Sequence, residues 1–261
     1  MPRRRAADAD ARGCAVAFLG AIEDACAERI LSAPGGCAIL DSRHPRLWDA
    51  NHLRVEAPDA PDPAALDAAA RAHFDALGFR MISVLDEAAG RALSGPLEAL
   101  GYRADHGLLM VLDGPPGRSP REAAVAEVGR EALTKSRLAG ALERGLGIEV
   151  GDQLVSRDAL LGAVVDERCF AVGLGRGHLA ARCQLYSRGT VAQIENVYTA
   201  PAHRRRGLSR ALVTRAAREA RAAGATVVFL VADAAAWTPA FYRSAGFADA
   251  GLLPCFVRTH D

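Results

Sequence analysis

The spacing of apolar residues divides the chain into alternating helical and extended segments. Apolar residues at helical spacing predict helices over 16–31, 64–77, a segment ending near 99–102, 130–145, 156–166, 207–223 and a short stretch after Pro239. Alternating or continuous apolar runs predict strands over 35–41, 52–56, 79–86, 106–114, 123–129, 226–233 and 252–258. The segment 168–201 predicts three antiparallel strands, with turns at 175–177 and 187–189.

The order of these elements is similar in the two halves of the chain. Residues 96–112 and 241–257 both run from a helix end through a glycine, an aromatic residue and a turn into an apolar strand. Between the halves, residues 114–120 cluster glycine and proline, which favours a linker. We therefore expect an α/β (α+β) fold with two domains, 1–117 and 118–261, each a mixed, mostly antiparallel sheet flanked by helices.

Composition and charge restrict the possible partners. The formal net charge of +1 and the 5% of aromatic residues argue against a nucleic-acid-binding protein. No run approaches the ~18 apolar residues of a membrane span, and the first residues lack a secretory cleavage signature. The cysteines form no C-x-x-C pair, and no histidine stands at zinc-ligand spacing from them, so we expect reduced thiols and no metal. We expect a cytoplasmic monomer or homodimer, and the arginine- and alanine-rich composition suggests a bacterial source.

The stretch VYTAPAHRRRGLSRAL, residues 197–212, brings an arginine run and a glycine to the start of a predicted helix. The first N–H groups of a helix lack partners within the helix, and the helix dipole adds positive potential, so such an end binds phosphate. Gly207 and the small Ser209 allow a ligand to approach the backbone closely, and the arginines at 204–206 add charged donors. The stretch therefore predicts a loop that binds a phosphorylated ligand.

Other glycine-rich or basic segments have simpler explanations. The chain contains no G-x-x-x-x-G-K-[ST] loop, and GLGRG at 173–177 lies between two predicted antiparallel strands, so it is expected to form a hairpin turn. Arg218 and Arg221 lie outside the apolar stripe of the 207–223 helix, where a solvated charged face is the better interpretation.

The arginine-glycine loop resembles the acetyl-CoA loop of the GCN5-related N-acetyltransferases (GNAT family), whose signature is [QR]-x-x-G-x-[GA] after a strand. The loop here is RRRGLS over 204–209, so Ser209 departs from the glycine or alanine of the pattern. Downstream, Tyr242, Gly246 and Phe247 match the family's Y-x-x-x-G-F segment, and Asp233 or a neighbour replaces the usual asparagine after the preceding strand. The resemblance covers about residues 123–257.

The resemblance implies a tandem GNAT protein that uses acetyl-CoA as cosubstrate, without a metal, to acetylate a primary amine of a small molecule or peptide. In such proteins the pantetheine arm lies where the strand 191–199 splays from the strand 226–233, and the loop holds the pyrophosphate. The cofactor-binding residues implied by position are Val197, Tyr198, Thr199, Arg204, Arg205, Arg206, Gly207, Leu208, Ser209, Arg210 and Asp233.

The resemblance also suggests catalytic roles. Tyr242 matches the residue that would protonate the leaving thiolate, although a packing role is the alternative. The Val197 backbone N–H is the candidate donor to the oxyanion. Glu195 would take the proton of the amine, directly or through water, or would be a structural acid paired with an arginine. Strand alternation places Glu195 on the face of Val197, with Asn196 and Tyr198 on the other face.

The first half lacks the corresponding chemistry. Its matching loop, residues 55–66, contains several acids but no arginine or glycine, and Leu97 stands at the position of Tyr242. We therefore expect a degenerate half that neither binds CoA nor catalyses, and that serves as structure or as a wall of the acceptor pocket. Two other functions stay open: a non-catalytic acyl-CoA-binding or interaction module, and a transferase of longer acyl groups.

Overall fold

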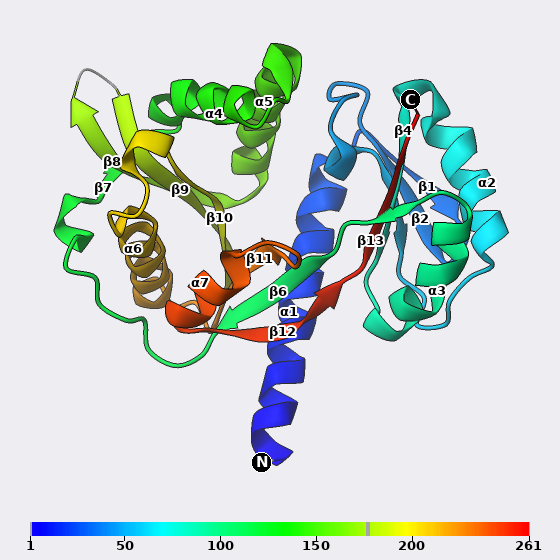
Figure 1. The fold of residues 1–261 in the computed structure, drawn as a ribbon. Coiled ribbons are helices and arrows are strands. Elements are labelled where there is room, and N and C mark those ends of the chain that lie inside the picture. The colour runs from blue at the N-terminus through cyan, green and yellow to red at the C-terminus, as the bar shows by residue number, and fades with distance from the viewer. Residues whose placement is uncertain (1, 176–177, 261) are drawn as a thin grey trace. The chain divides into compact units, whose positions relative to one another are not determined.

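The computed structural model describes residues 2–175 and 178–260, and their side chains from residue 10 onward. The chain forms two compact units, each built from separate segments. The N-terminal unit contains Leu19–Leu109, Ala232–Pro239 and Gly251–Asp261, and the C-terminal unit contains Met1–Phe18, Met110–Val231 and Ala240–Ala250. The mixed α/β architecture expected from the sequence is confirmed, because each unit is centred on a mixed sheet with helices packed against it (Figure 1).

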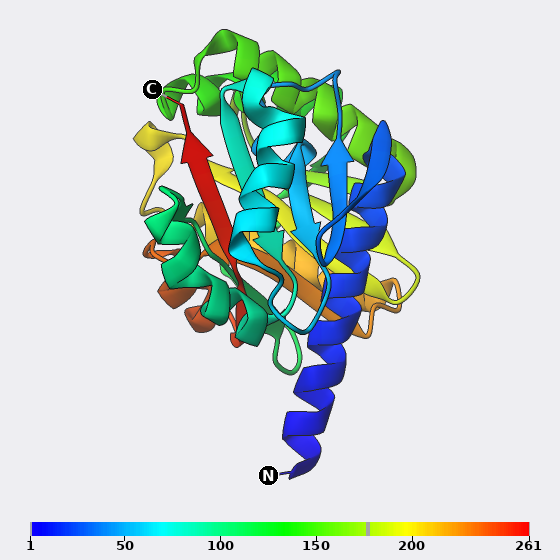
Figure 2. The same cartoon turned by 90° about the vertical axis from the view of Figure 1, so that its right-hand side faces the viewer.

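The N-terminal unit has a six-stranded sheet in the order β1-β2-β3-β4-β13-β5. Its strands are β1 Arg29–Ala33, β2 Gly36–Leu40, β3 His52–Val55, β4 Phe79–Val84, β5 Arg103–Ala104 and β13 Cys255–Thr259. Its helices are α2 Pro63–Phe74 and α3 Glu87–Ala99, with 3₁₀ turns at Trp48–Ala50 and Asp75–Leu77. The α2 and α3 helices lie in front of this sheet in Figure 2, and their apolar faces form a core with it that includes Leu53, Leu66, Phe74, Ile82, Leu93 and Phe256.

The C-terminal unit has a seven-stranded sheet in the order β12-β6-β11-β10-β9-β8-β7. Its strands are β6 Gly107–Leu112, β7 Ala126–Val128, β8 Asp166–Gly175, β9 His178–Arg188, β10 Val191–Thr199, β11 Val227–Asp233 and β12 Phe247–Leu253. Its helices are α4 Glu131–Glu143, α5 Gly147–Val164, α6 Leu208–Ala222 and α7 Thr238–Ser244, with 3₁₀ turns at Glu122–Ala124 and Pro201–His203. The α4–α5 pair and α6 cover the β8–β10 region from opposite sides (Figure 1).

The two sheets exchange strands. β6 comes from the first half of the sequence and lies between β12 and β11 of the seven-stranded sheet, whereas β13 comes from the second half and lies between β4 and β5 of the six-stranded sheet. The single strand predicted over 252–258 is therefore wrong. It is two strands, one in each sheet, and Pro254 separates them because proline has no N–H for a ladder. A domain boundary between 117 and 118 stays a prediction.

The helix predicted over 16–31 is also placed differently. α1 runs from Pro2 to Cys26, and the following residues form β1, which pairs antiparallel with β2 across a turn at Gly35 with φ of +70°. Exposed and half-buried side chains alternate along β1, because side chains of a strand point to opposite faces with a period of two. The helical spacing therefore did not apply to these residues. Among the described residues, no helix has both the length and the apolarity that a bilayer span requires.

Candidate active site

A β-bulge shapes the middle of β10. Glu195 pairs with Gln184 of β9 and Tyr198 pairs with Arg182, so Asn196 and Val197 have no register partner between them. Asn196 takes the left-handed conformation, with φ of +55°. Since Gln184 and Arg182 point to the same face of β9, the bulge places Tyr198 on the face of Glu195. The alternation that put Tyr198 on the opposite face is wrong for this reason.

The strands β10 and β11 separate just before the bulge. They pair in parallel only over Val191–Gln193 with Val227–Phe229, although β10 continues to Thr199 and β11 to Asp233. The backbone of residues 194–199 therefore has β9 on one side and no ladder to β11 on the other. This is the splay expected from the family resemblance, and it leaves an open strand edge to which an extended ligand can hydrogen-bond.

The loop after β10 leads into α6 through two residues with positive φ. Arg205 has φ of +59°, and Gly207, the N-cap of α6, has φ of +74°. A glycine at this N-cap avoids the steric cost that a side chain has in the left-handed region. The backbone N–H groups of Gly207, Leu208, Ser209 and Arg210 donate no hydrogen bond to any described residue. Four free amides at one helix start form an anion site of the type predicted.

Two predicted cofactor residues converge on an acid that the sequence did not point to. Arg204 donates to the Thr199 carbonyl at 3.1 Å and pairs through Nη2 with Glu143, the last residue of α4. The Tyr198 hydroxyl donates to the other oxygen of Glu143 at 2.8 Å. Tyr198, and then Arg204, lower the pKa of Glu143. Glu143 therefore joins the end of α4 to both β10 and the predicted pyrophosphate loop.

The remaining arginines of the loop differ in their surroundings. Arg205 and Arg206 are exposed, and no described residue pairs with their guanidinium groups. Arg210 points to α7, where its Nη1 donates to the Ser244 carbonyl at 2.7 Å and its guanidinium lies 5.8 Å from the Phe241 ring. Arg205 and Arg206 are thus available to a phosphate, whereas Arg210 joins α6 to α7.

Thr199, Ser209 and Asp233 also take defined positions. The Thr199 and Ser209 hydroxyls lie 2.8 Å apart and share a hydrogen bond between the end of β10 and the first turn of α6. The Asp233 carboxylate, at the end of β11, accepts from the Ala235 amide at 2.9 Å and shapes the turn that follows.

Tyr242 lies on α7 in a largely apolar setting. Its ring packs at 5.0 Å from that of Phe241 and 6.2 Å from that of Phe247. Burial raises the pKa of Tyr242, and the charge of Glu195 raises it further. The phenol therefore keeps its proton across the physiological range, as a proton donor must. The electrostatic effect of Glu195 also shows that the two predicted catalytic groups share one region.

Glu195 is held within a polar network on the face of the sheet under α4 and α5. Its Oε2 accepts from Gln193 Nε2 at 2.7 Å, and its Oε1 accepts from the Asn196 amide at 3.2 Å. Asn196 Nδ2 in turn donates to Gln184 at 2.6 Å. These contacts orient the carboxylate beside the bulge.

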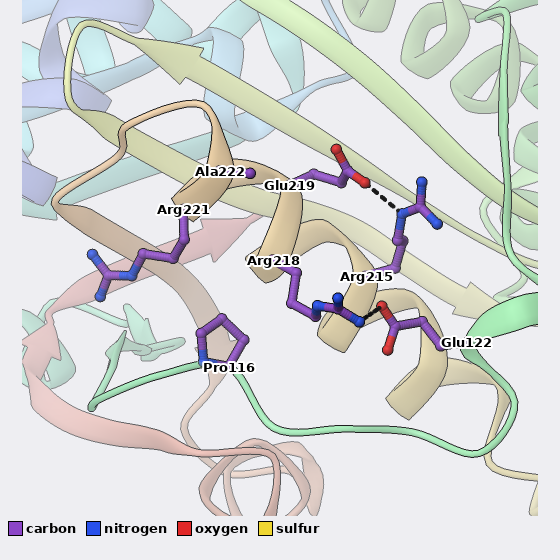
Figure 3. Close-up of a pocket in the computed structure, with 7 residues that line it drawn as sticks. All are labelled: Pro116, Glu122, Arg215, Arg218, Glu219, Arg221 and Ala222. Carbon is purple, nitrogen blue, oxygen red and sulfur yellow. Dashed lines mark hydrogen bonds and ion pairs between the residues drawn. The ribbon is translucent and has the colours of Figure 1, made fainter.

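The hollow along the other half of α6 is not part of this site. Figure 3 shows a cavity of about 320 Å³ lined by Pro116, Glu122, Arg215, Arg218, Glu219, Arg221 and Ala222. Arg218 pairs with Glu122 at 2.7 Å, and Arg221 donates to the Ala225 carbonyl at 2.9 Å. Arg218 is exposed, as expected for a solvated charged face, and Arg221 is half-buried; both side chains also hold neighbouring segments together.

The acids of the first-half loop have structural partners. Glu56 pairs with Arg54 at 2.7 Å, Asp62 accepts from two amides at the start of α2, and Leu97 is fully buried in the core. These contacts agree with a structural role for the N-terminal unit. Within the described residues, no group of histidine, cysteine and acidic side chains is arranged to hold a metal ion.

Comparisons with known proteins agree with this geometry. The sequence from 147 to 247 matches the model of the acetyltransferase (GNAT) family. No curated protein matches the chain. Among solved structures, a functionally unknown conserved protein from Staphylococcus epidermidis is similar over 90% of this chain and 95% of its own, with a TM-score of 0.65 and 12% identity.

Solved structures that carry the family's name are also similar to this chain. A GCN5-related N-acetyltransferase from Kribbella flavida matches over 93% of this chain and 95% of its own, with a TM-score of 0.60 and 18% identity. One from Sphaerobacter thermophilus covers 69% of this chain and 59% of its own, with a TM-score of 0.51 and 15% identity. The TM-scores of these structures show a shared fold. The match to the family model supports acyl transfer in general. The chain therefore contains a domain of the GNAT acetyltransferase family over residues 147–247.

Proposed function

We propose that the protein is an N-acetyltransferase that moves an acetyl group from acetyl-CoA to a primary amine of a small molecule or peptide. Three features that lie close together along the chain carry the proposal. They are the bulge in β10, the separation of β10 from β11, and the unpaired amides at the start of α6. Together they provide an open strand edge that ends at an anion site. An extended diphosphate ester such as CoA is complementary to that combination.

The loop and strand would bind the cosubstrate. The amides of 207–210 and the exposed Arg205 and Arg206 would hold the pyrophosphate, while Val197 and Thr199 would pair with the pantetheine arm. Arg204 would contribute after exchanging its contact with Glu143 for a phosphate oxygen. This binding directs the thioester toward the bulge, where Glu195 and Tyr242 lie.

The side chains near the bulge would carry the proton transfers. Glu195 would accept a proton from the acceptor ammonium, so that the neutral amine attacks the thioester carbonyl carbon directly. The Val197 N–H, which lies in the bulge and outside the β9 register, would donate to the oxygen as it gains negative charge. As the carbon–sulfur bond breaks, Tyr242 would protonate the leaving thiolate, and the cationic nitrogen would lose its second proton to the resulting phenolate. Its raised pKa keeps the phenol protonated for this step.

A thiol-release assay tests the proposal. The purified protein would be given acetyl-CoA and a panel of amines, with a baseline lacking amine to account for the protein's own cysteines. Amine-dependent thiol release, with an acetylated product by mass spectrometry, is the expected result. Acetyl-CoA binding by calorimetry without turnover of any amine would favour the non-catalytic acyl-CoA-binding module. Faster turnover of longer acyl-CoA esters would favour the alternative donor.

A further inference from the structure

The face of β9 beneath α4 holds a buried cation that lacks a carboxylate. Arg182 is only 2% exposed. Its Nε donates to the Ser136 hydroxyl at 3.2 Å and its Nη1 to the Asn196 carbonyl at 3.0 Å, and the guanidinium lies 5.0 Å from the Tyr198 ring. Among the described residues, no acid pairs with it and nothing accepts a hydrogen bond from Nη2.

Three other buried arginines have counterions among the described residues. Arg54 pairs with three acids, Arg80 with Asp67 at 2.9 Å, and Arg137 with Asp158 at 2.7 Å. Burying a guanidinium without an anion is costly, so a structural arginine at such a place normally has one. Burial, and then the charge of Arg137, lower the pKa of Arg182 to about 10, although the charge of Asp158 acts in the opposite direction.

The helix above packs closely over the unsatisfied nitrogen but offers it no partner. Gly140 of α4 faces Arg182, and a Cβ built there would lie 3.5 Å from Nη2 and 3.3 Å from the Tyr198 ring. The helix therefore contributes no side chain that could neutralise or cover Nη2. Arg144, on the following turn, has its own pKa lowered by burial and by the charge of Arg137, and the charge of Glu143 opposes this effect.

The other end of the same face has unsatisfied neutral groups. Tyr186 and Gln193 are register partners, 1% and 5% exposed, and neither the Tyr186 hydroxyl nor Gln193 Oε1 has a hydrogen-bond partner among the described residues. Glu195 lies between the two ends, because it pairs with Gln184, midway between Arg182 and Tyr186. Two residues along a strand span about 7 Å. The face thus offers, in order, a cation, the predicted base, and a neutral donor with a neutral acceptor.

We propose that the acceptor is an amine that also carries a carboxylate, such as an amino acid, and that Arg182 binds the carboxylate while Glu195 receives the amino group. Tyr186 and Gln193 then bind a neutral polar group beyond the amine. This inference rests on the proposed function, since it assigns the acceptor of the same site. Under this inference Arg182 determines acceptor specificity, in addition to its structural role of hydrogen-bonding β9 to the bulge.

Paired amines test the inference in the wild-type protein. Each pair consists of a carboxylated amine and its neutral counterpart: an α-amino acid with its amide, β-alanine with propylamine, and γ-aminobutyrate with butylamine. Phosphoethanolamine is added to separate carboxylate from phosphate recognition. The carboxylated members should give kcat/KM values at least tenfold above their partners. Equal or better turnover of the neutral members, or of phosphoethanolamine, overturns the inference and leaves the proposed function standing.

Variants locate the effect. Arg182→Gln should raise KM for the best carboxylated amine at least tenfold, with kcat and the acetyl-CoA Kd little changed, and should not affect its neutral partner. Arg182→Lys should restore part of the loss because it keeps the charge. Arg168→Gln, which removes the ion pairs of this β8 arginine with Glu127 and Glu219, is the matched control.

Two further results would also overturn the inference. One is equal loss with both members of a pair in Arg182→Gln, which would indicate a structural role. The other is the absence of binding by every carboxylated amine, by calorimetry, to protein that binds acetyl-CoA. If Arg182→Gln does not fold, the wild-type pairs decide the question. Failure of the proposed function itself would appear separately, as absent acetyl-CoA binding.

Discussion

The hydroxyls of Thr199 and Ser209 lie 2.8 Å apart, so the last residue of β10 is hydrogen-bonded to the first turn of α6. Ser209 is the position at which the loop departs from the family signature. Its hydroxyl therefore has a partner of its own, which explains how serine is accommodated. Ser209→Ala should lower the free energy of unfolding by about 1 kcal/mol, the usual contribution of one such bond.

That variant should keep its affinity for acetyl-CoA, because alanine satisfies the signature and leaves the backbone amides in place. Denaturant unfolding and calorimetry measure the two quantities. A tenfold weaker acetyl-CoA Kd in Ser209→Ala would show instead that the hydroxyl binds the ligand.

Gly207→Val should abolish acetyl-CoA binding, because a β-branched residue does not adopt the φ of +74° that aims the α6 amides at the ligand. Calorimetry measures the loss. Gly224→Val is the matched control: it carries the same type of strain at φ of +94°, and a Cβ there meets nothing within 4 Å. Unchanged affinity in Gly207→Val would refute the placement of the pyrophosphate.

Tyr242→Phe should lower kcat more than tenfold and leave the acetyl-CoA Kd nearly unchanged, since only the proton of the phenol is lost. Because the pKa of Tyr242 is raised, wild-type kcat should show no decline near pH 10 from ionisation of this group. Steady-state kinetics across pH measure both. A fully active Tyr242→Phe protein would leave Tyr242 with a packing role.

Glu143→Gln should tighten acetyl-CoA binding several-fold. The substitution removes the negative charge that pairs with Arg204 and leaves that guanidinium free for the pyrophosphate. Calorimetry at two salt concentrations should show a larger gain at low salt. Glu127→Gln, which also removes an acid paired with an arginine, is the control. Weaker binding in Glu143→Gln would mean that Glu143 positions Arg204 rather than competing for it.

Asp67→Asn should destabilise the N-terminal unit by about 3 kcal/mol near pH 7, as expected for breaking a buried ion pair. Asp67 accepts from Arg80 at 2.9 Å and from the Tyr102 hydroxyl at 3.0 Å. These contacts hold its pKa below the usual value despite burial. Its stabilisation is therefore present above about pH 4, the unfolded value, and is lost as pH falls toward the lower folded value.

Denaturant unfolding from pH 2 to pH 7 should show the difference between wild type and Asp67→Asn shrinking on the acid side. Asp249→Asn, which breaks the exposed pair with Arg243, should cost less than about 1 kcal/mol. A pH-independent difference would contradict the assigned ion pair.

The residues of the 204–209 loop predicted its structure, but they did not predict the strand bulge and the acid that lie next to it. Gly207 and the arginine run indicated the helix start correctly, because a left-handed N-cap and free amides follow from a few adjacent residues. The bulge at Asn196 was not predicted, since alternation assumes regular pairing. Glu143 could not be found from the sequence either, because it lies 61 residues from Arg204 and meets it only in the folded protein.

The pairing of strands that are distant in the sequence could not be predicted either. The pattern around Pro254 indicates extended chain, but hydrophobic alternation does not say which sheet a strand joins. The fold class could be predicted because it depends on the type and order of elements. Membership of β6 and β13 in particular sheets depends on long-range contacts that one sequence does not reveal.

The exchange of β6 and β13 has a consequence for how the protein can be made. A gene divided after codon 117 would encode two fragments, each missing a strand from the interior of its own sheet rather than from its border. During synthesis, the N-terminal sheet must wait until residues 255–259 have left the ribosome before β13 can fill its place. We therefore expect neither fragment to be soluble alone, and both to be rescued when they are produced together.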